Sequence, residues 1–131
     1  MKHLTAEEAR RFAEQWLPAW TGDQPERLAA FYADDVLYLD PAVPQGVRGK
    51  EALLAYFRKL LARFPDWVWT QVEAFPMQDG FLNKWRATIP VGDAALEIVG
   101  VCLVQLNDEG RIYRNEVYFD RSSLLDLLRR K

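Results

Sequence analysis

The sequence predicts an α+β fold in which helices cover one face of a cone-like, curved antiparallel sheet. Apolar residues recur at three- and four-residue spacing before Pro65, which is typical of helices. After Pro65 the chain consists of β-rich segments separated by turn signals. The order helix, helix, strand, helix and four strands requires the helices to pack on one face, which leaves a pocket at the open end of the sheet.

The first two elements are predicted helices. Thr5, followed by Glu7 and Glu8, marks the start of the first, and Pro18 can kink it near its end at Trp20. Its apolar stripe consists of Ala9, Phe12, Ala13, Trp16, Leu17 and Trp20. We expect Asp23 to cap the second helix, with Pro25 in its first turn and its end at residues 33–35.

A strand and a long helix follow. Residues 36–41 are β-branched and aromatic and end at a proline, which predicts a short strand and then a loop. The next helix is expected from Gly49 to Pro65, with one broad apolar stripe formed by Leu53, Tyr56, Phe57, Leu60, Leu61 and Phe64. Everything after this helix is predicted to be β until the last residues.

Four consecutive strands are predicted to form an antiparallel meander. They span residues 67–75, 81–89, 95–106 and 111–119, with DG, VGD and NDEG turn signals between them. Residues 123–128 are expected to form a terminal helix, and the basic residues 129–131 suit its C-terminal end.

Composition narrows the classes of function. The chain has 131 residues, half of them hydrophobic, so we expect one domain over residues 1–131. Its 17 basic and 19 acidic residues nearly cancel, which argues against nucleic acid as a partner. The charged N-terminal segment is unlike a signal peptide, and no apolar run has the length of a membrane span, which favours a cytoplasmic protein.

Four sequence segments resemble the nuclear transport factor 2-like superfamily, and within it the SnoaL-like group. They are GD at residues 22–23, FYADDVLYLDP at 31–41, GVRGKEALLAYF at 46–57 and GRIYRNEVYFD at 110–120. The resemblance implies a single SnoaL-like domain with a cystatin-like cone fold. It leaves the function open, because this superfamily includes isomerases, cyclases, dehydratases, epoxide hydrolases and binding modules.

The most informative match is Asp40, which precedes Pro41 at the end of the first strand. In the similar ketosteroid isomerases, an Asp in this context is the base that moves a proton next to a carbonyl. The resemblance therefore implies that Asp40 is a general base. Alternatively, Asp40 accepts hydrogen bonds from the backbone of the turn that follows. Tyr38 lies on the same face of the strand, where its hydroxyl can orient a ligand or bond to Asp40.

The resemblance does not extend to the remaining catalytic groups. The isomerase tyrosine and acid that donate to the oxyanion fall at Trp16 and Cys102, so efficient steroid isomerisation is not expected. Epoxide hydrolase residues fall at Trp85, Ala87 and Val117, which disfavours that reaction. A register slip of one residue would instead point Arg86 and Glu116 inward.

Further pocket candidates follow from the strand pattern. We expect an apolar ligand to contact a set of residues from several elements, and Glu97 can alternatively face solvent beside basic residues of the neighbouring strand. His3 is the only histidine, so neither a metal site nor another cofactor is predicted. The candidate ligand contacts are Trp16, Phe57, Trp85, Glu97, Cys102, Asn115 and Val117.

Two hypotheses remain. The first is a cofactor-independent isomerase, lyase or cyclase in which Asp40 transfers a proton on a hydrophobic carbonyl substrate. The second is a non-catalytic ligand-binding or dimerisation module, and an epoxide hydrolase is the less favoured alternative. By analogy with the superfamily, we expect a homodimer that binds a small hydrophobic molecule.

Overall fold

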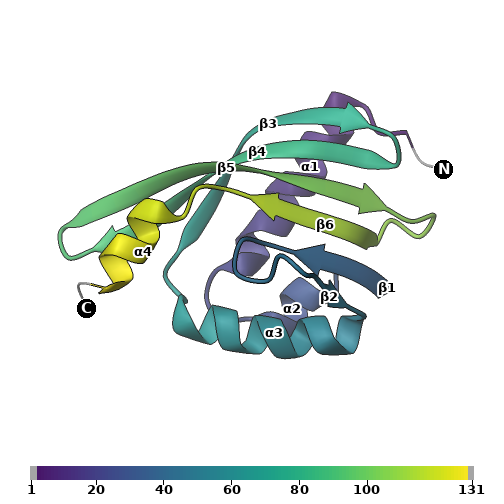
Figure 1. Cartoon of the computed structure of the whole chain (residues 1–131). Helices are drawn as coiled ribbons and strands as arrows, with labels where there is room; N and C mark the ends of the chain where they lie inside the picture. Colours follow the sequence, from purple (N-terminus) through teal and green to yellow (C-terminus); the bar gives the residue numbers. More distant parts are fainter. Residues whose placement is uncertain (1–2, 130–131) are drawn as a thin grey trace.

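The computed structural model describes residues 3–129, which form one six-stranded sheet with helices packed on it (Figure 1). The helices are α1 (Ala6–Trp16), the 3-10 helix η1 (Leu17–Trp20), α2 (Pro25–Ala29), α3 (Lys50–Arg63) and α4 (Ser122–Arg129). The strands are β1 (Tyr32–Leu39), β2 (Val47–Arg48), β3 (Val68–Met77), β4 (Gly80–Val91), β5 (Ala94–Leu106) and β6 (Ile112–Tyr118). This architecture confirms the α+β prediction.

The sheet is mostly antiparallel, and its strand order is β2-β1-β6-β5-β4-β3. Strands β3 to β6 form the predicted meander. The exception is β1, which runs parallel to β6, so the expectation of a wholly antiparallel sheet is wrong at this one pair. The short β2 pairs with β1 inside the segment that we expected to be a loop.

Helix α1 begins where the sequence predicts. The Thr5 side chain accepts a hydrogen bond from the Glu8 backbone at 3.1 Å, and the Glu8 carboxylate accepts one from the Thr5 backbone at 3.0 Å. This reciprocal capping box satisfies two otherwise free N–H groups. At Pro18, which has no N–H to continue the α-helical pattern, the chain tightens into η1.

The second predicted helix is too long, and its cap is wrong. Helix α2 ends at Ala29, and residues 33–35 belong to β1 instead. Tyr32 and Val36 are both fully buried, and Tyr32 is registered against Ile112 of β6, so sheet pairing prevails over local helix propensity. The N-cap residue is Gln24 and makes no side-chain cap, whereas Asp23 has a positive φ of 55°.

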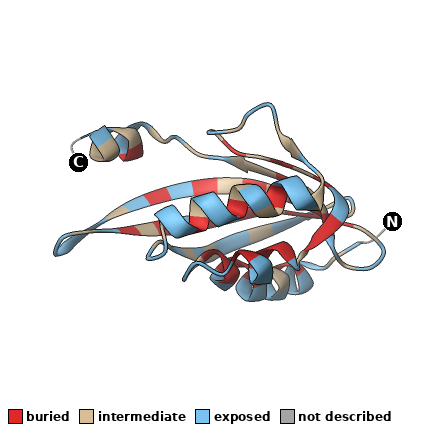
Figure 2. Ribbon diagram, turned by 90° about the horizontal axis from the view of Figure 1, so that it is seen from below, coloured by how far each residue is buried: buried red, intermediate tan, exposed pale blue. Residues whose placement is uncertain are grey.

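Helix α1 packs against the inner face of the sheet, and α3 packs against α2 and β1 (Figures 1 and 2). Along β4 the side chains of Phe81, Trp85 and Ile89 are buried on this inner face, while Lys84 and Arg86 are exposed on the outer face. Figure 2 shows this alternation as red and blue bands. Of the two registers that the sequence left open, the structure therefore has the one with Trp85 inward and Arg86 outward.

The fourth helix closes one end of the fold. Helix α4 follows β6 and buries Leu124, and it lies at the end of the sheet away from the N-terminus (Figure 1). The predicted basic end of this helix extends beyond Arg129 into residues 130–131, which lie outside the described range. Across residues 3–129, every helix is too short or too polar to cross a membrane.

Candidate functional site

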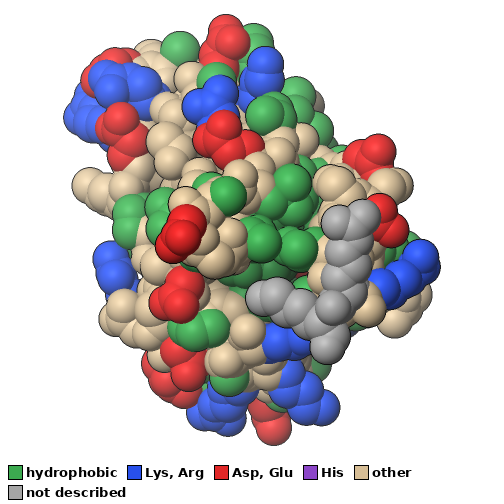
Figure 3. Space-filling view, turned by 90° about the vertical axis from the view of Figure 1, so that its left-hand side faces the viewer, with side chains coloured by type: hydrophobic (Ala, Val, Ile, Leu, Met, Phe, Trp, Pro, Cys, Tyr) green, Lys and Arg blue, Asp and Glu red, His purple; other side chains and the backbone are tan. Residues whose placement is uncertain are grey.

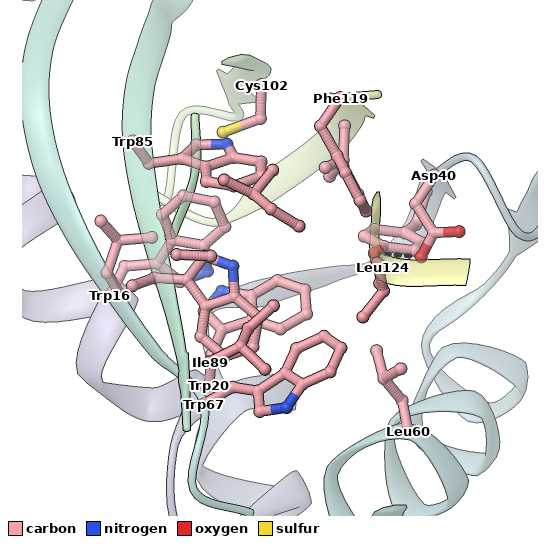
Figure 4. A pocket seen from close by; sticks show the side chains of 16 residues that line it. Trp16, Trp20, Asp40, Leu60, Trp67, Trp85, Ile89, Cys102, Phe119 and Leu124 are labelled. Carbon is pink, nitrogen blue, oxygen red and sulfur yellow. Dashed lines mark hydrogen bonds between the residues drawn. The ribbon is translucent and has the colours of Figure 1, made fainter. Parts of the chain in front are cut away.

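An apolar cavity of about 90 Å³ lies between the N-terminal helices, the inner face of the sheet and α4 (Figure 4). Among the residues that the structure describes, Asp40 is the only charged one that lines it. In Figure 4 Asp40 lies across the cavity from Trp16 and Trp85. The lining residues are Trp16, Leu17, Trp20, Tyr38, Asp40, Leu60, Trp67, Trp69, Trp85, Ala87, Ile89, Ile98, Cys102, Val117, Phe119 and Leu124.

Asp40 follows directly after β1 and is only 8% exposed. Its Oδ1 accepts hydrogen bonds from the backbone of Ala42 at 2.8 Å and of Val43 at 3.1 Å. Its Oδ2 accepts from the hydroxyl of Tyr38 at 2.8 Å and from that of Tyr56 at 2.7 Å. One oxygen thus accepts from the backbone of the turn that the sequence allowed, and the other is held by Tyr38 of the cavity wall and by Tyr56 outside it.

The two tyrosines reach Asp40 from different elements. Tyr38 lies two residues before it on β1 and is 1% exposed, and Tyr56 comes from the apolar stripe of α3 and is partly buried. Burial raises the pKa of Tyr38 well above its usual value, and the Asp40 charge adds to this effect. Burial also raises the pKa of Tyr56, and its hydrogen bond to Asp40 acts in the same direction. Both hydroxyls therefore stay protonated and donate to the carboxylate at neutral pH.

Two indole N–H groups close to the cavity make no hydrogen bond of good geometry within residues 3–129. Trp16 and Trp20 both line it, and the Nε1 atoms of both are buried and unpartnered within residues 3–129. The Trp16 ring lies near the Tyr32 hydroxyl. Burial raises the pKa of this hydroxyl, and the Trp16 N–H lowers it by a smaller amount. Buried N–H groups are normally paired, so these donors can accommodate an oxygen atom of a ligand or of water.

Trp85 owes its place on the cavity wall to a glycine on the adjacent strand. Gly100 is registered against Trp85, and a Cβ at this position would lie 2.5 Å from Cζ2 of the Trp85 ring and 2.9 Å from Cβ of Phe119. Without a side chain at Gly100, the indole can lie flat over the strand. The Phe119 ring then packs on its edge, with 5.6 Å between the ring centroids.

Cys102 occupies the cavity wall next to Trp85 in Figure 4. It is 1% exposed, and burial raises the pKa of its thiol to about 12. At neutral pH the side chain is a protonated thiol, which is a poor nucleophile and a weak donor. The geometry gives Cys102 a packing role at the cavity surface.

Six of the nine predicted site residues line the cavity, and three do not. Phe57 is fully buried beneath it among the rings of Trp20, Tyr32 and Tyr38. Asn115 is also fully buried, where it accepts a hydrogen bond from Tyr32 and donates one to the Leu103 carbonyl. The six that line the cavity are Trp16, Tyr38, Asp40, Trp85, Cys102 and Val117.

The prediction that Glu97 contacts a ligand in the pocket is wrong. Its side chain is 60% exposed on the outer face of the sheet, where it lies 3.9 Å from Arg86. Glu116 does not line the cavity either; its carboxylate accepts hydrogen bonds from Arg114 and Tyr118. Both carboxylates therefore belong to the charged outer surface that the sequence offered as the alternative.

Sequence reasoning missed Tyr56 as a partner of Asp40 and missed several aromatic residues of the cavity wall. Tyr56 and Leu60 are four residues apart on one helix face, and this spacing places both beside Asp40. A polar hydroxyl in an otherwise apolar helical stripe was the available signal. Trp20, Trp67, Trp69 and Phe119 were not proposed as contacts either, since apolar periodicity does not separate a cavity wall from a filled core.

The described residues offer no group of three or more histidine, cysteine, aspartate or glutamate side chains that could hold a metal ion. His3 is exposed and lies before α1. The polar groups at or beside the cavity include the carboxylate of Asp40, the hydroxyls of Tyr38 and Tyr56, and the N–H groups of Trp16 and Trp20.

Solved structures share this fold over nearly the whole chain. A SnoaL-like protein of unknown function from Burkholderia thailandensis matches with a TM-score of 0.77 and 20% identity, covering 91% of this chain and 99% of that one. A Catenulispora acidiphila protein with a ketosteroid isomerase-like fold, solved with trimethylamine, matches with a TM-score of 0.74 and 22% identity, covering 87% and 88%. An LEH-like epoxide hydrolase from Mycobacterium tuberculosis matches with a TM-score of 0.72 and 20% identity, covering 95% and 92%.

These identities support a common fold and leave the activity open. A search of curated proteins found no match for the chain. The family model of the SnoaL-like domain matches residues 13–115, a range that contains Trp16 of α1, strand β1 and Asp40. The chain therefore belongs to the SnoaL-like family.

Proposed function

We propose that this protein is a cofactor-independent enzyme of the isomerase or lyase type, in which Asp40 transfers a proton on a small hydrophobic carbonyl compound. The observation that supports this best is a single buried carboxylate on the wall of an otherwise apolar cavity. An apolar cavity with a few convergent polar groups is a common setting for catalysis, and a carboxylate in such a cavity can act as a base next to a carbonyl.

The proposed reaction divides the polar groups by role. Oδ2 of Asp40 faces the tyrosines and takes the substrate proton, while the turn formed by Oδ1 holds the carboxylate in place. The Tyr56 hydroxyl lies at the outer edge of the cavity and can move away from Oδ2 as substrate enters. We assign the stabilisation of the developing oxyanion to the N–H of Trp20, which is buried and has no acceptor within residues 3–129.

A second candidate function is ligand binding without catalysis. The observation in its favour is that Asp40 already accepts four hydrogen bonds, which is the acceptor capacity of a carboxylate. In this case Asp40 joins the turn to the two tyrosines and thereby shapes the cavity. Epoxide hydrolysis is not favoured, because Trp85, Ala87 and Val117 lie where the hydrolase machinery would be.

Turnover distinguishes the two candidates. Purified protein is titrated with ketones, enones, phenols and epoxides, with tryptophan fluorescence as the binding signal, and every binder is then incubated and analysed for products by NMR. The enzyme proposal predicts an isomerised or cleaved product that the Asp40→Asn variant does not form while it still binds the compound. Glu97→Gln, which removes an exposed carboxylate, is the matched control and is expected to keep full turnover.

We also propose that the protein pairs with a second copy through the outer face of its sheet. Val68, Phe75, Val99 and Tyr118 are large hydrophobic residues that lie exposed there. A dimer would shield this apolar surface from water. Light scattering at several concentrations tests the proposal: a mass of twice 15.2 kDa for the wild type and a monomer for Val99→Lys would support it.

A further inference from the structure

A wider cleft of about 500 Å³ lies outside the apolar cavity, between α3, the chain after β6 and α4. The two spaces are adjacent, because five residues line both: Asp40, Leu60, Trp67, Phe119 and Leu124. A ligand that places one end in the cavity therefore extends its other end into this cleft.

The outer cleft is strongly basic. Lys59 and Arg63 of α3 line it on one side, and Arg121 and Arg129 line it on the other. Of the described residues that line it, Asp40 is the only acidic one, and both of its oxygens already accept hydrogen bonds. Since the whole chain has a net charge of −2, this local excess of positive charge is a property of the site and not of the composition.

Within residues 3–129 the four basic residues have no acidic partner, and Arg63 lies over the ring of Phe64, 5.0 Å from its centroid. None of them forms an ion pair with a residue in the range 3–129, whereas Arg10, Arg58, Arg86 and Arg114 elsewhere on the surface each do. Lys59 and Arg63 are four residues apart on one helix, where two like charges destabilise the helix slightly. Figure 3, which faces the α4 side, shows hydrophobic side chains in the middle of this face, with basic and acidic side chains around them.

We infer that the outer cleft binds an anionic group, a carboxylate or a phosphate, on a ligand whose apolar end occupies the inner cavity. The substrate class is then an amphipathic anion: a carbonyl beside Asp40, a short apolar spacer along Leu60 and Phe119, and a negative head near Lys59, Arg63 and Arg121. Guanidinium groups suit such heads because they bind carboxylates and phosphates through two hydrogen bonds. The carbonyl end rests on the function proposed above, and the anionic head does not.

The test compares ligands that differ only in the head group. 6-Oxoheptanoate, its neutral methyl ester and 5-oxohexyl phosphate share a four-carbon spacer and a methyl ketone, and each is titrated by tryptophan fluorescence and by calorimetry. Wild-type protein is expected to bind at least one anion roughly tenfold tighter than the ester, with a preference that weakens as salt is added. The stronger of the two anions identifies the head group as carboxylate or phosphate.

A charge-matched pair of variants tests the site. The triple variant Lys59→Gln, Arg63→Gln, Arg121→Gln is expected to bind the anions only as well as the ester. The control Arg27→Gln, Arg48→Gln, Lys84→Gln removes the same charge from exposed positions outside the cleft and is expected to keep the wild-type preference. If the triple variant does not fold, Lys59→Gln alone, at an exposed helix position, must show a smaller loss of the same kind.

Two results would overturn the inference: equal affinity of the wild type for the ester and both anions, or an equal loss of anion preference in the control variant. Failure of the proposed function looks different. In that case no member of the ketone series, neutral or anionic, shows Asp40-dependent turnover, while the preference for anions persists in the binding data.

Discussion

Filling the cavity by Ala87→Leu is the perturbation whose size follows most directly from the structure. Ala87 is 4% exposed on β4, between Trp69 of β3 and Ile98 of β5, and all three residues line the cavity. Leucine adds three carbon atoms on the cavity side. Their burial is worth about 2 kcal/mol at roughly 0.8 kcal/mol per methylene group.

The cavity volume leads to the same figure independently. An apolar space of about 90 Å³ in a protein core destabilises it by about 2 kcal/mol at roughly 24 cal/mol per Å³. Because the leucine also loses rotamer freedom, we expect Ala87→Leu to raise the free energy of unfolding by about 1 kcal/mol. Urea denaturation measures this change, and titration with a ketone that binds the wild type is expected to show lost binding.

Ala95→Leu is the control, because Ala95 is exposed on the outer face of β5. It is expected to leave ligand binding unchanged and to alter the free energy of unfolding by less than about 0.5 kcal/mol. The reasoning is refuted if Ala87→Leu destabilises the protein by more than about 1 kcal/mol, as overpacking does, and still binds the ketone with wild-type affinity.

Three other perturbations test the surroundings of the cavity. Tyr38→Phe removes a fully buried hydrogen bond to a carboxylate and is expected to lower the free energy of unfolding by about 2 kcal/mol. Tyr56→Phe is expected to lower it by about 1 kcal/mol, because water can reach that site. Urea titrations that rank the two variants in the opposite order would contradict the geometry. Gly100→Ala is expected to displace the Trp85 ring and to cost about 1–3 kcal/mol, and an unchanged near-ultraviolet spectrum and stability would count against the contact. Burial raises the pKa of Cys102 from 9.0 to about 12, so the folded state favours its protonated form. The free energy of unfolding should therefore fall as the pH rises above 9. A denaturation midpoint that stays constant from pH 8 to pH 11, or fast thiol labelling of the native protein, would contradict this.

The elements were predicted best where they depend on local or periodic sequence signals and not on pairing with distant residues. The capping box at Thr5 and Glu8 and the alternation along β4 are local or periodic signals, and the structure confirms both. The segment at residues 33–35 was assigned to the wrong element, because its strand depends on pairing with β6, some eighty residues further along the chain. No local pattern contains that information.

The candidate site was predictable in part for the same reason. Asp40 was identified from its resemblance to the base of ketosteroid isomerases and Tyr38 from its position two residues earlier, and the structure places both on the cavity wall. Tyr56 reaches the same oxygen from α3, a contact that depends on how this helix crosses β1. Glu97 was assigned to the pocket against its strand parity, and β5 turns it outward toward Arg86.

The central claim is that Asp40 removes a proton from a carbonyl compound bound in the cavity. The most direct measurement is the rate at which a bound ketone exchanges its α-protons for deuterium in D₂O, followed by NMR for the wild type and for Asp40→Asn. The account predicts exchange that saturates with ketone concentration and falls at least about a hundredfold in the variant, the usual contribution of a general base. Saturable binding with no exchange above the rate in buffer, or equal exchange in both proteins, would contradict it.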